Sequence, residues 1–379
     1  MVESYTLGHV RLLSGHGVLD DQLISVVNGR IEEIRDHRSG LGADIDGRGQ
    51  LCLPGIVDLH SDALSREYRP RPGARLPVDI AMQAAEGNLL AAGVTTAFHA
   101  VSFQAKSPVG LPIGSPNAPE IHEAISGYAN PRMDHRVLHR LDVRCREGVG
   151  MLRRVLEPDQ VPLVSYEDHT PGQGQYRDRT VMERWLREAQ HMDPQRAAAH
   201  VDQLVAERDQ QLPFKEETLA WLGEAAGDGE IRLMGHDPVT PAEIDALVAR
   251  NAVIAEFPTT LEAAVHATQQ GIATVAGAPN ILLGKSHSGN VAAIDLAQAG
   301  ALGILASDYL PSSMLMATYA LAQTGLLAPF DAMRLISENP ARAAGLDDRG
   351  VVAAGYRADL VLCAEVNERP RVMRTLSAQ

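Results

Sequence analysis

The spacing of hydrophobic and polar residues predicts short strands at both ends of the chain. Residues 5–13, 22–27 and 30–34 read as strands separated by tight turns. Asn28-Gly29, between the second and third of them, is the dipeptide typical of a two-residue hairpin turn. A similar pattern of turns and short strands returns at residues 350–363. We therefore expect a small β layer that is built from both termini and brackets a central region.

The central region alternates apolar runs of strand length with longer helical stretches. Stretches such as 79–92, 120–128, 240–250, 261–270 and 290–299 have the length and the Ala, Leu and Glu content of helices. The eight expected strands span residues 56–60, 94–101, 137–145, 161–166, 231–235, 252–257, 272–277 and 302–306. Eight strand-then-helix units in about 290 residues favour an α/β fold of the (β/α)8 TIM-barrel type over an open sheet.

This alternation also predicts the division into domains. We expect the barrel to occupy residues 54–342. Residues 1–53 together with 343–379 would form a small β-sandwich domain.

Residues that can bind a metal gather at the C-terminal ends of the expected strands. The first strand ends on His60 and Asp62, and side chains two positions apart in a strand point the same way, so both could bind one ion. Barrel enzymes have their active sites at this face. The other strands end near residues of the same kind, namely Glu147, Glu167, His169, His236, Glu256 and Asp308.

Three imidazoles and two carboxylates form the expected metal ligands, which are His60, Asp62, His169, His236 and Asp308. They suffice for one divalent ion, or for two that share a bridging ligand. Neutral imidazole and carboxylate suit zinc, manganese or iron, and of these we expect zinc. A bound metal would make hydroxide available near neutral pH, and we expect Asp308 to hold that water and take its proton as the catalytic base.

The ligand that would bridge two ions stays open. Many two-metal barrels use a carboxylated lysine at a strand end, but none of the three lysines of this chain ends one of the middle strands. Glu147 or Glu256 would have to bridge instead, or the site holds a single ion.

Three loops carry groups that suit phosphate. Arg69 and Arg71 belong to a proline-rich loop with four arginines that follows the His60–Asp62 pair. Lys285 and His287 lie in Gly-Lys-Ser-His-Ser-Gly after the seventh strand, where barrels commonly bind phosphate. Arg177 ends a third, glycine-containing loop. For each loop the alternative is an ordinary solvated turn.

Charge and composition limit the classes of molecule that this protein could bind and the cellular compartment in which we expect it. A formal charge of -14 argues against general binding of nucleic acid or of anionic membranes, so we expect a small phosphorylated substrate. Three cysteines without a Cys-x-x-Cys pair argue against a disulfide framework. The N-terminus has no signal-like segment and no run reaches the length of a membrane span, so we expect a cytoplasmic protein.

The sequence leaves open whether the protein forms a homo-oligomer. It also leaves open whether the polar, helical segment 176–230 covers the site as a lid or is a surface excursion.

Several motifs resemble the amidohydrolase superfamily. They are Leu-Pro-Gly-Ile-Val-Asp-Leu-His60, Ala-Gly-Val-Thr-Thr96, Ser-Asp308 and the closing Gly-Tyr-Arg-Ala-Asp-Leu-Val-Leu362. A narrower resemblance, over residues 50–363, is to the α-D-ribose 1-methylphosphonate 5-triphosphate diphosphatases of the carbon-phosphorus lyase pathway. It is carried by His-Ser-Asp62, Arg-Pro-Arg-Pro-Gly73, Glu-Asp-His169-Thr-Pro-Gly-Gln, Ala-Glu-Phe-Pro-Thr-Thr-Leu-Glu262, Gly-Ala-Pro-Asn280, Gly-Lys-Ser-His-Ser-Gly-Asn290 and Ser-Asp-Tyr-Leu-Pro311.

This resemblance implies a metal-dependent hydrolase that releases diphosphate from a ribose 5-triphosphate in phosphonate catabolism. Two positions depart from the family pattern. The carboxylate that follows Arg-Cys is displaced by one place to Glu147, and Lys285 replaces a glycine. The alternative activity is hydrolysis of a C–N bond in an amide, lactam or amidine, which the arginine loop disfavours. A non-catalytic binding protein is the third alternative, and the complete ligand set argues against it.

Overall fold

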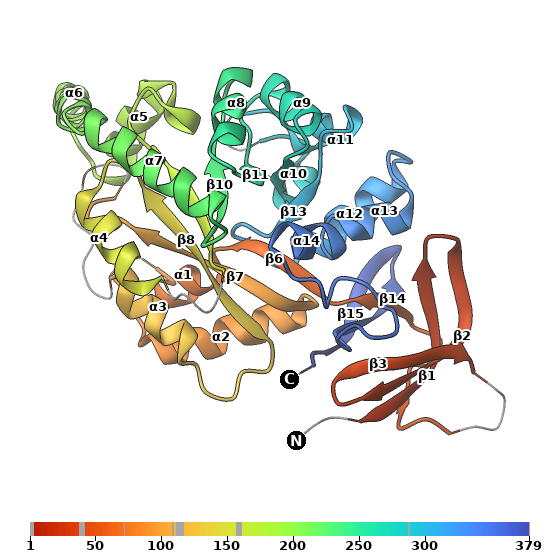
Figure 1. The fold of residues 1–379 in the computed structure, drawn as a ribbon. Helices are drawn as coiled ribbons and strands as arrows, with labels where there is room; N and C mark the ends of the chain where they lie inside the picture. Colours follow the sequence, from red (N-terminus) through yellow and green to blue (C-terminus); the bar gives the residue numbers. More distant parts are fainter. Residues whose placement is uncertain are drawn as a thin grey trace.

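Two β-sheets organise the structure, a computed structural model that describes residues 4–37, 42–71, 73–107, 110, 117–156, 161–286 and 289–378. The larger sheet has eight parallel strands, and the smaller one collects strands from both ends of the chain (Figure 1). The parallel strands are β6 (Ile56–Ser61), β7 (Val94–Phe103), β8 (Asp134–Asp142), β9 (Leu163–Glu167), β10 (Arg232–His236), β11 (Ile254–Glu256), β12 (Ala273–Gly277) and β13 (Ile304–Ala306).

The eight parallel strands form a nearly closed barrel. They follow one another in chain order from β6 to β13, and the two outer strands meet through a parallel bridge between Ser61 and Asp308. The Asp308 N–H donates to the His60 carbonyl at 3.0 Å, and the Asp62 N–H donates to the Asp308 carbonyl at 2.7 Å. The expected TIM-barrel fold is confirmed. These hydrogen bonds also bring the ends of the first and last strands together.

Strand β8 is displaced from its expected position by three residues. The expected strand ended at Cys145, whereas β8 ends at Asp142, whose side chain accepts the N–H of Arg144 at 3.0 Å. Such a turn, closed by an aspartate side chain, stops the strand. Cys145 then caps the next helix, and Glu147 lies exposed in its first turn. Glu147 is therefore not at the end of a barrel strand.

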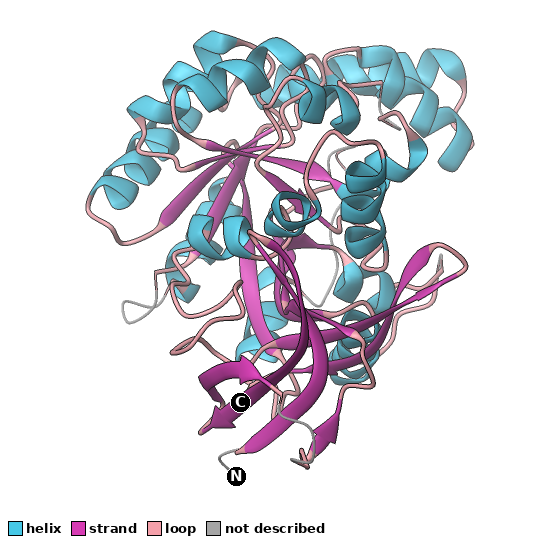
Figure 2. Cartoon of the chain, turned by 90° about the vertical axis from the view of Figure 1, so that its right-hand side faces the viewer, coloured by secondary structure: helices cyan, strands magenta, loops and turns pink. Residues whose placement is uncertain are grey.

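Helices cover the outside of the barrel, and in Figure 2 many of them arch over the strands on the side away from the chain termini. One apolar core fills the barrel interior, with Leu59, Leu138 and Ile254 fully buried in it. A larger core lies between the strands and the helices. The helices are α1 (Ala63–Tyr68), α2 (Val78–Ala91), α3 (Ala118–Ser126), α4 (Arg146–Val155), α5 (Arg179–Ala189), α6 (Pro194–Asp209), α7 (Leu212–Gly227), α8 (Pro241–Ala249), α9 (Leu261–Gln269), α10 (Ala278–Leu283), α11 (Ala293–Gln298), α12 (Ser313–Gln323), α13 (Pro329–Arg334) and α14 (Glu338–Ala343).

The terminal strands form a mixed seven-stranded sheet beside the barrel. Its order is β15-β14-β5-β1-β2-β3, with β4 paired to β1. Asn28 and Gly29 both have positive φ, at 55° and 70°, as the predicted two-residue turn between β2 and β3 requires. The strands are β1 (Tyr5–Ser14), β2 (Gly17–Val27), β3 (Arg30–Asp36), β4 (Ile45–Asp46), β5 (Leu51–Pro54), β14 (Leu360–Val366) and β15 (Arg369–Leu376).

Gly55 is the link between the two sheets. It joins β5 to β6, and a Cβ atom at this position would lie 2.2 Å from the Thr95 Oγ1 atom. Only glycine allows so close an approach. The domain boundaries expected at residues 53 and 343 stay a prediction. No helix in the described part of the chain is long and apolar enough to cross a membrane.

Helices α6 and α7 are tied to the ends of β8 and β9 by buried ion pairs. Arg208 donates both terminal nitrogens to the Asp142 carboxylate, each at 2.8 Å. Asp168 accepts from Arg144 and from Lys215, each at 2.9 Å. The side chain of Asp168 is only 12% exposed, so three cations share one largely buried carboxylate. Helices α6 and α7, which belong to the segment 176–230, are thus anchored beside the strand ends.

We expect Asp168→Ala to lower the free energy of unfolding by about 3 kcal/mol, because it removes the counter-charge of Lys215 and one of the two carboxylates that Arg144 and Arg208 each contact. Urea unfolding followed by circular dichroism measures this. Asp202→Ala is the matched control, since Asp202 of helix α6 also pairs with an arginine, Arg179 of helix α5, but its side chain is 72% exposed. We expect that control to change stability by less than about 1 kcal/mol. Equal effects of the two substitutions would contradict the anchoring role of Asp168.

Candidate metal centre

A cavity of about 370 Å³ opens at the C-terminal ends of the barrel strands. All five expected ligands line it. They come from the end of β6, from the residues just after β9, from the end of β10 and from the residues just after β13, and they are His60, Asp62, His169, His236 and Asp308. Residues up to 248 positions apart in the chain therefore face one space, because parallel strands end at the same face of a barrel.

The ligand atoms fall into two groups. In the first, one atom each of His60, Asp62 and Asp308 lie within 4.8 Å of one another, and His60 Nε2 is 3.9 Å from an Asp62 oxygen. In the second, the same limit holds for Glu167, His169 and His236, and His169 Nδ1 is 3.7 Å from a Glu167 oxygen. Each group could hold a divalent metal, since it offers imidazole and carboxylate donors close enough to share an ion.

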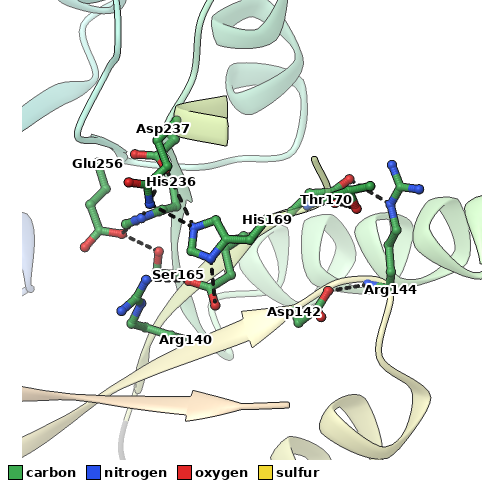
Figure 3. A network of polar contacts seen from close by, with 12 residues as sticks. Arg140, Asp142, Arg144, Ser165, His169, Thr170, His236, Asp237 and Glu256 are labelled. Atoms are coloured by element: carbon green, nitrogen blue, oxygen red, sulfur yellow. Dashed lines mark hydrogen bonds and ion pairs between the residues drawn. The ribbon is translucent and has the colours of Figure 1, made fainter. Parts of the chain in front are cut away.

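Glu256 connects the two groups, and Figure 3 shows its carboxylate near His236 and Ser165. Its carboxylate accepts from His60 Nδ1 at 2.7 Å, from His236 Nδ1 at 2.6 Å and from Ser165 Oγ at 2.5 Å. A proton held on each Nδ1 leaves the Nε2 lone pair available as a ligand. Glu256 itself is fully buried below the cavity. It therefore orients one histidine of each group, which differs from the bridging role that the sequence left open for it.

The charge of Glu256 is stabilised by the histidines that it orients. Burial alone would raise the pKa of the Glu256 carboxyl, but His236 and His60 outweigh burial and hold this pKa well below its usual range. The carboxylate is consequently ionised wherever the protein is folded near neutral pH. An ionised acceptor fixes the ring orientation and the tautomer of both histidines.

Glu167, which the sequence places near a strand end, is a ligand candidate beyond the five expected ligands. It is the last residue of β9 and is buried, and burial raises its pKa while Arg140 and the neighbouring histidines lower it to about 2. The guanidinium of Arg140 donates to Glu167 at 2.6 Å and lines the cavity from strand β8. The sequence feature that indicates Glu167 is its position at the end of an apolar strand. We used the same feature to predict His60 as a ligand.

Two buried atoms support a metal as the missing partner. His169 Nδ1 and Asp237 Oδ2 have no hydrogen-bond partner among the described residues. Asp237 Oδ2 lies 3.7 Å from His169 Nε2 and 3.5 Å from His236 Nε2. A buried donor set with orphaned lone pairs is costly unless something positive is bound to it. The residues present therefore fit a divalent ion.

The residues expected to bind phosphate are placed differently from the metal ligands. Arg69, Arg71, Arg177 and Lys285 are exposed, and none of them lines the cavity. Their loops follow β6, β9 and β12, so they belong to the end of the barrel at which the cavity opens. Ser286, which belongs to the predicted phosphate loop motif, and Asn290, which follows it, do line the cavity. His287 lies outside the described residues.

Comparisons with known proteins define the family. A sequence model of the amidohydrolase family matches residues 179–376, which is more than half of the chain. The chain belongs to the amidohydrolase family. A relative from Escherichia coli (strain K12), named alpha-D-ribose 1-methylphosphonate 5-triphosphate diphosphatase, is 36% identical over 358 residues, which cover 91% of this chain and 92% of the relative. The protein is accordingly a hydrolase.

Solved amidohydrolase-fold structures resemble the whole chain. N-acetylglucosamine-6-phosphate deacetylase from Pasteurella multocida superposes with a TM-score of 0.61 at 12% identity, covering 99% of this chain and 98% of that one. Enamidase, titled a member of the amidohydrolase superfamily, has a TM-score of 0.58 at 15% identity, with coverage of 100% and 96%. At these identities the likeness concerns the fold, which includes the terminal sheet as well as the barrel.

Proposed function

We propose that this amidohydrolase family member is a metal-dependent diphosphatase. It would act in the cytoplasm on α-D-ribose 1-methylphosphonate 5-triphosphate, with zinc as the metal, and release diphosphate and the 5-phosphate. The observation that carries the proposal is the relative of that name, which is 36% identical over nearly the full length of both chains. The two ligand groups at the cavity supply the chemistry that such a reaction needs.

The charge of the cavity explains why a metal would be required. Four carboxylates line it, those of Asp62, Glu167, Asp237 and Asp308, and among the described lining residues Arg140 is the cation of fixed charge that opposes them. A triphosphate would be repelled from such a wall. Bound divalent metal supplies positive charge there and lowers the pKa of water.

Asp308 would act as the general base. Its backbone is fixed on both sides by the hydrogen bonds to the end of β6, and its φ of 53° is unusual for a non-glycine residue. The preceding Ser307 donates its N–H and its Oγ to the buried carboxylate of Asp58, at 3.0 and 2.5 Å. Asp308 would take one proton from water while the water oxygen bonds to phosphorus. The P–O bond to diphosphate breaks in the same step, so the substrate gains one water.

The exposed cations would meet the parts of the substrate that extend out of the cavity. Arg69, Arg71, Arg177 and Lys285 follow three different strands at the same end of the barrel. A guanidinium fork suits phosphate oxygens and binds them equally well before and during the reaction. Such uniform binding affects KM more than kcat.

For Arg71→Ala we expect KM for the triphosphate to rise by between about 10- and 100-fold with kcat nearly unchanged, because one charge-assisted hydrogen bond contributes about 1.5–3 kcal/mol. Steady-state kinetics at low and high salt measures it, and the difference should shrink at high salt. Arg371→Ala, at an exposed position of β15 on the terminal sheet, is the control. An unchanged KM would assign phosphate recognition to other residues.

A direct assay decides between diphosphate release and C–N hydrolysis. The metal-loaded protein is incubated with α-D-ribose 1-methylphosphonate 5-triphosphate, with nucleoside triphosphates, and with a panel of amides, lactams and amidines. We expect diphosphate and a ribose 5-phosphate in equal amounts from the first substrate, and slower turnover of the nucleotides. Turnover of an amide or lactam without diphosphate release from any triphosphate would replace the proposal with the commoner C–N chemistry.

A further inference from the structure

A second cluster of metal-ligating side chains lies on the terminal sheet, outside the barrel cavity. His9 belongs to β1, Asp21 belongs to β2, and His37 directly follows β3. One ligand atom of each lies within 4.8 Å of the other two. An Asp21 carboxylate oxygen is 3.0 Å from His9 Nδ1 and 3.8 Å from His37 Nδ1, and the two imidazole rings are 3.9 Å apart between centroids.

The burial of His37 is the observation that points to a ligand. Its side chain is fully buried, yet neither ring nitrogen has a hydrogen-bond partner among the described residues. A buried imidazole without partners loses its hydration and gains nothing in exchange. One carboxylate oxygen and one further imidazole lie beside the His37 ring, and these are donors that a first-row transition metal binds in proteins.

The backbone is shaped to bring these three side chains together. Strand β1 carries irregularities in its pairing with β2 on both sides of Val10, and bulges of this kind re-aim side chains. His9 and Asp21 both have positive φ, at 53° and 48°. The His37 N–H donates to the Asp21 carbonyl at 2.7 Å. A Cβ at Gly8 would lie 2.8 Å from His37 Nε2, so glycine makes room for the ring.

We propose that His9, Asp21 and His37 form a binding site for a divalent transition metal, with zinc as the expected ion. Zinc bonds of about 2.0–2.1 Å at tetrahedral angles place ligand atoms roughly 3.3 Å apart. The two measured separations from Asp21, 3.0 and 3.8 Å, bracket that value. Two nitrogens and one oxygen favour zinc, nickel or copper over magnesium or calcium.

The ion would have a structural role. It would join β1, β2 and the chain after β3 at one edge of the terminal sheet, and these strands are not continuous with the barrel. Because metal binds the folded site and not the separated strands, it raises the stability of the fold. The half-exposed side chains of His9 and Asp21 leave the remaining coordination positions to water. The site does not depend on the proposed diphosphatase activity.

The test uses the full chain without a histidine tag, because a tag binds the same metals. Zinc bound per chain is measured by elemental analysis after dialysis, and Zn²⁺ is titrated calorimetrically into protein whose barrel ions are already bound. We expect the unmodified chain to bind one more zinc than His9→Ala, Asp21→Asn and His37→Gln. We expect the affinity for this ion to fall more than about 100-fold in each variant, since even second-shell partners of metal ligands contribute 10- to 100-fold.

Two controls keep the result interpretable. His16→Ala removes an exposed histidine from the turn between β1 and β2 and should keep the additional zinc. Hydrolase turnover should be unchanged in all these variants, and the zinc-dependent rise in melting temperature should be lost only in the three ligand variants. If His37→Gln fails to fold, the other two decide the matter, because their side chains are 49% and 56% exposed. Equal zinc content and affinity in the unmodified chain, His9→Ala and Asp21→Asn would overturn the site.

Discussion

Asp308→Asn is expected to lower kcat by about 1,000-fold while leaving the fold intact, since a positioned general base typically contributes 10²- to 10⁴-fold. Asparagine has nearly the same shape as aspartate and keeps one oxygen that can accept or ligate. It cannot take a proton from water. The backbone hydrogen bonds that join this residue to the end of β6 do not involve the side chain, so the substitution leaves the closure of the barrel in place.

Three measurements separate loss of the base from loss of structure or metal. Circular dichroism and melting temperature report the fold, elemental analysis reports the metal content, and single-turnover kinetics reports the chemical step. Asp331→Asn is the control, since Asp331 is an exposed carboxylate on α13 that lies outside the cavity. A variant with normal metal content and full activity would remove Asp308 as the base. A variant without metal would point to a ligand role instead.

The barrel could be predicted because its signal is local. Each buried parallel strand is a short apolar run between turns, and the run is visible in the sequence without knowledge of the partner strand. The end of β8 could not be placed this way, because the strand stops where the Asp142 side chain accepts the N–H of Arg144, although the strand-like pattern continues to Val143. The same error moved Glu147 to a strand end in the prediction.

The ligand set could be predicted from the same strand ends, but the residues that orient it could not. His60 and Glu256 are 196 positions apart, and nothing near either residue indicates that they meet. A carboxylate at the end of a barrel strand could either bind a metal or accept a hydrogen bond from a histidine ligand, and the sequence does not distinguish the two roles. The two roles differ in whether the carboxylate contacts the Nδ1 of a histidine or shares an ion with its Nε2, and that is a property of the folded barrel. The cluster of His9, Asp21 and His37 escaped prediction for the same reason, since it forms across three strands.

Glu256→Gln should weaken metal binding at both ligand groups, although Glu256 need not touch the metal. A carboxylate accepts from the Nδ1–H of His60 and of His236 at the same time. A glutamine amide has one accepting oxygen and one donating nitrogen, so it can serve only one histidine in the original way. The other histidine would receive a hydrogen bond at Nδ1, and its proton would move to Nε2. That proton blocks the nitrogen that faces the cavity.

The expected result is a 10- to 100-fold loss of metal affinity, the range known for second-shell partners of metal ligands. Turnover at limiting metal should fall in proportion and recover in part when metal is raised, a rescue that Asp308→Asn should not show. Metal titration followed by calorimetry and by activity measures both. Ser165→Ala is the milder comparison, because it removes one hydrogen bond to Glu256 and leaves both histidine contacts. Glu262→Gln, at an exposed position in the first turn of α9, should have no effect. Unchanged affinity in Glu256→Gln would mean that the strand ends alone orient the imidazoles.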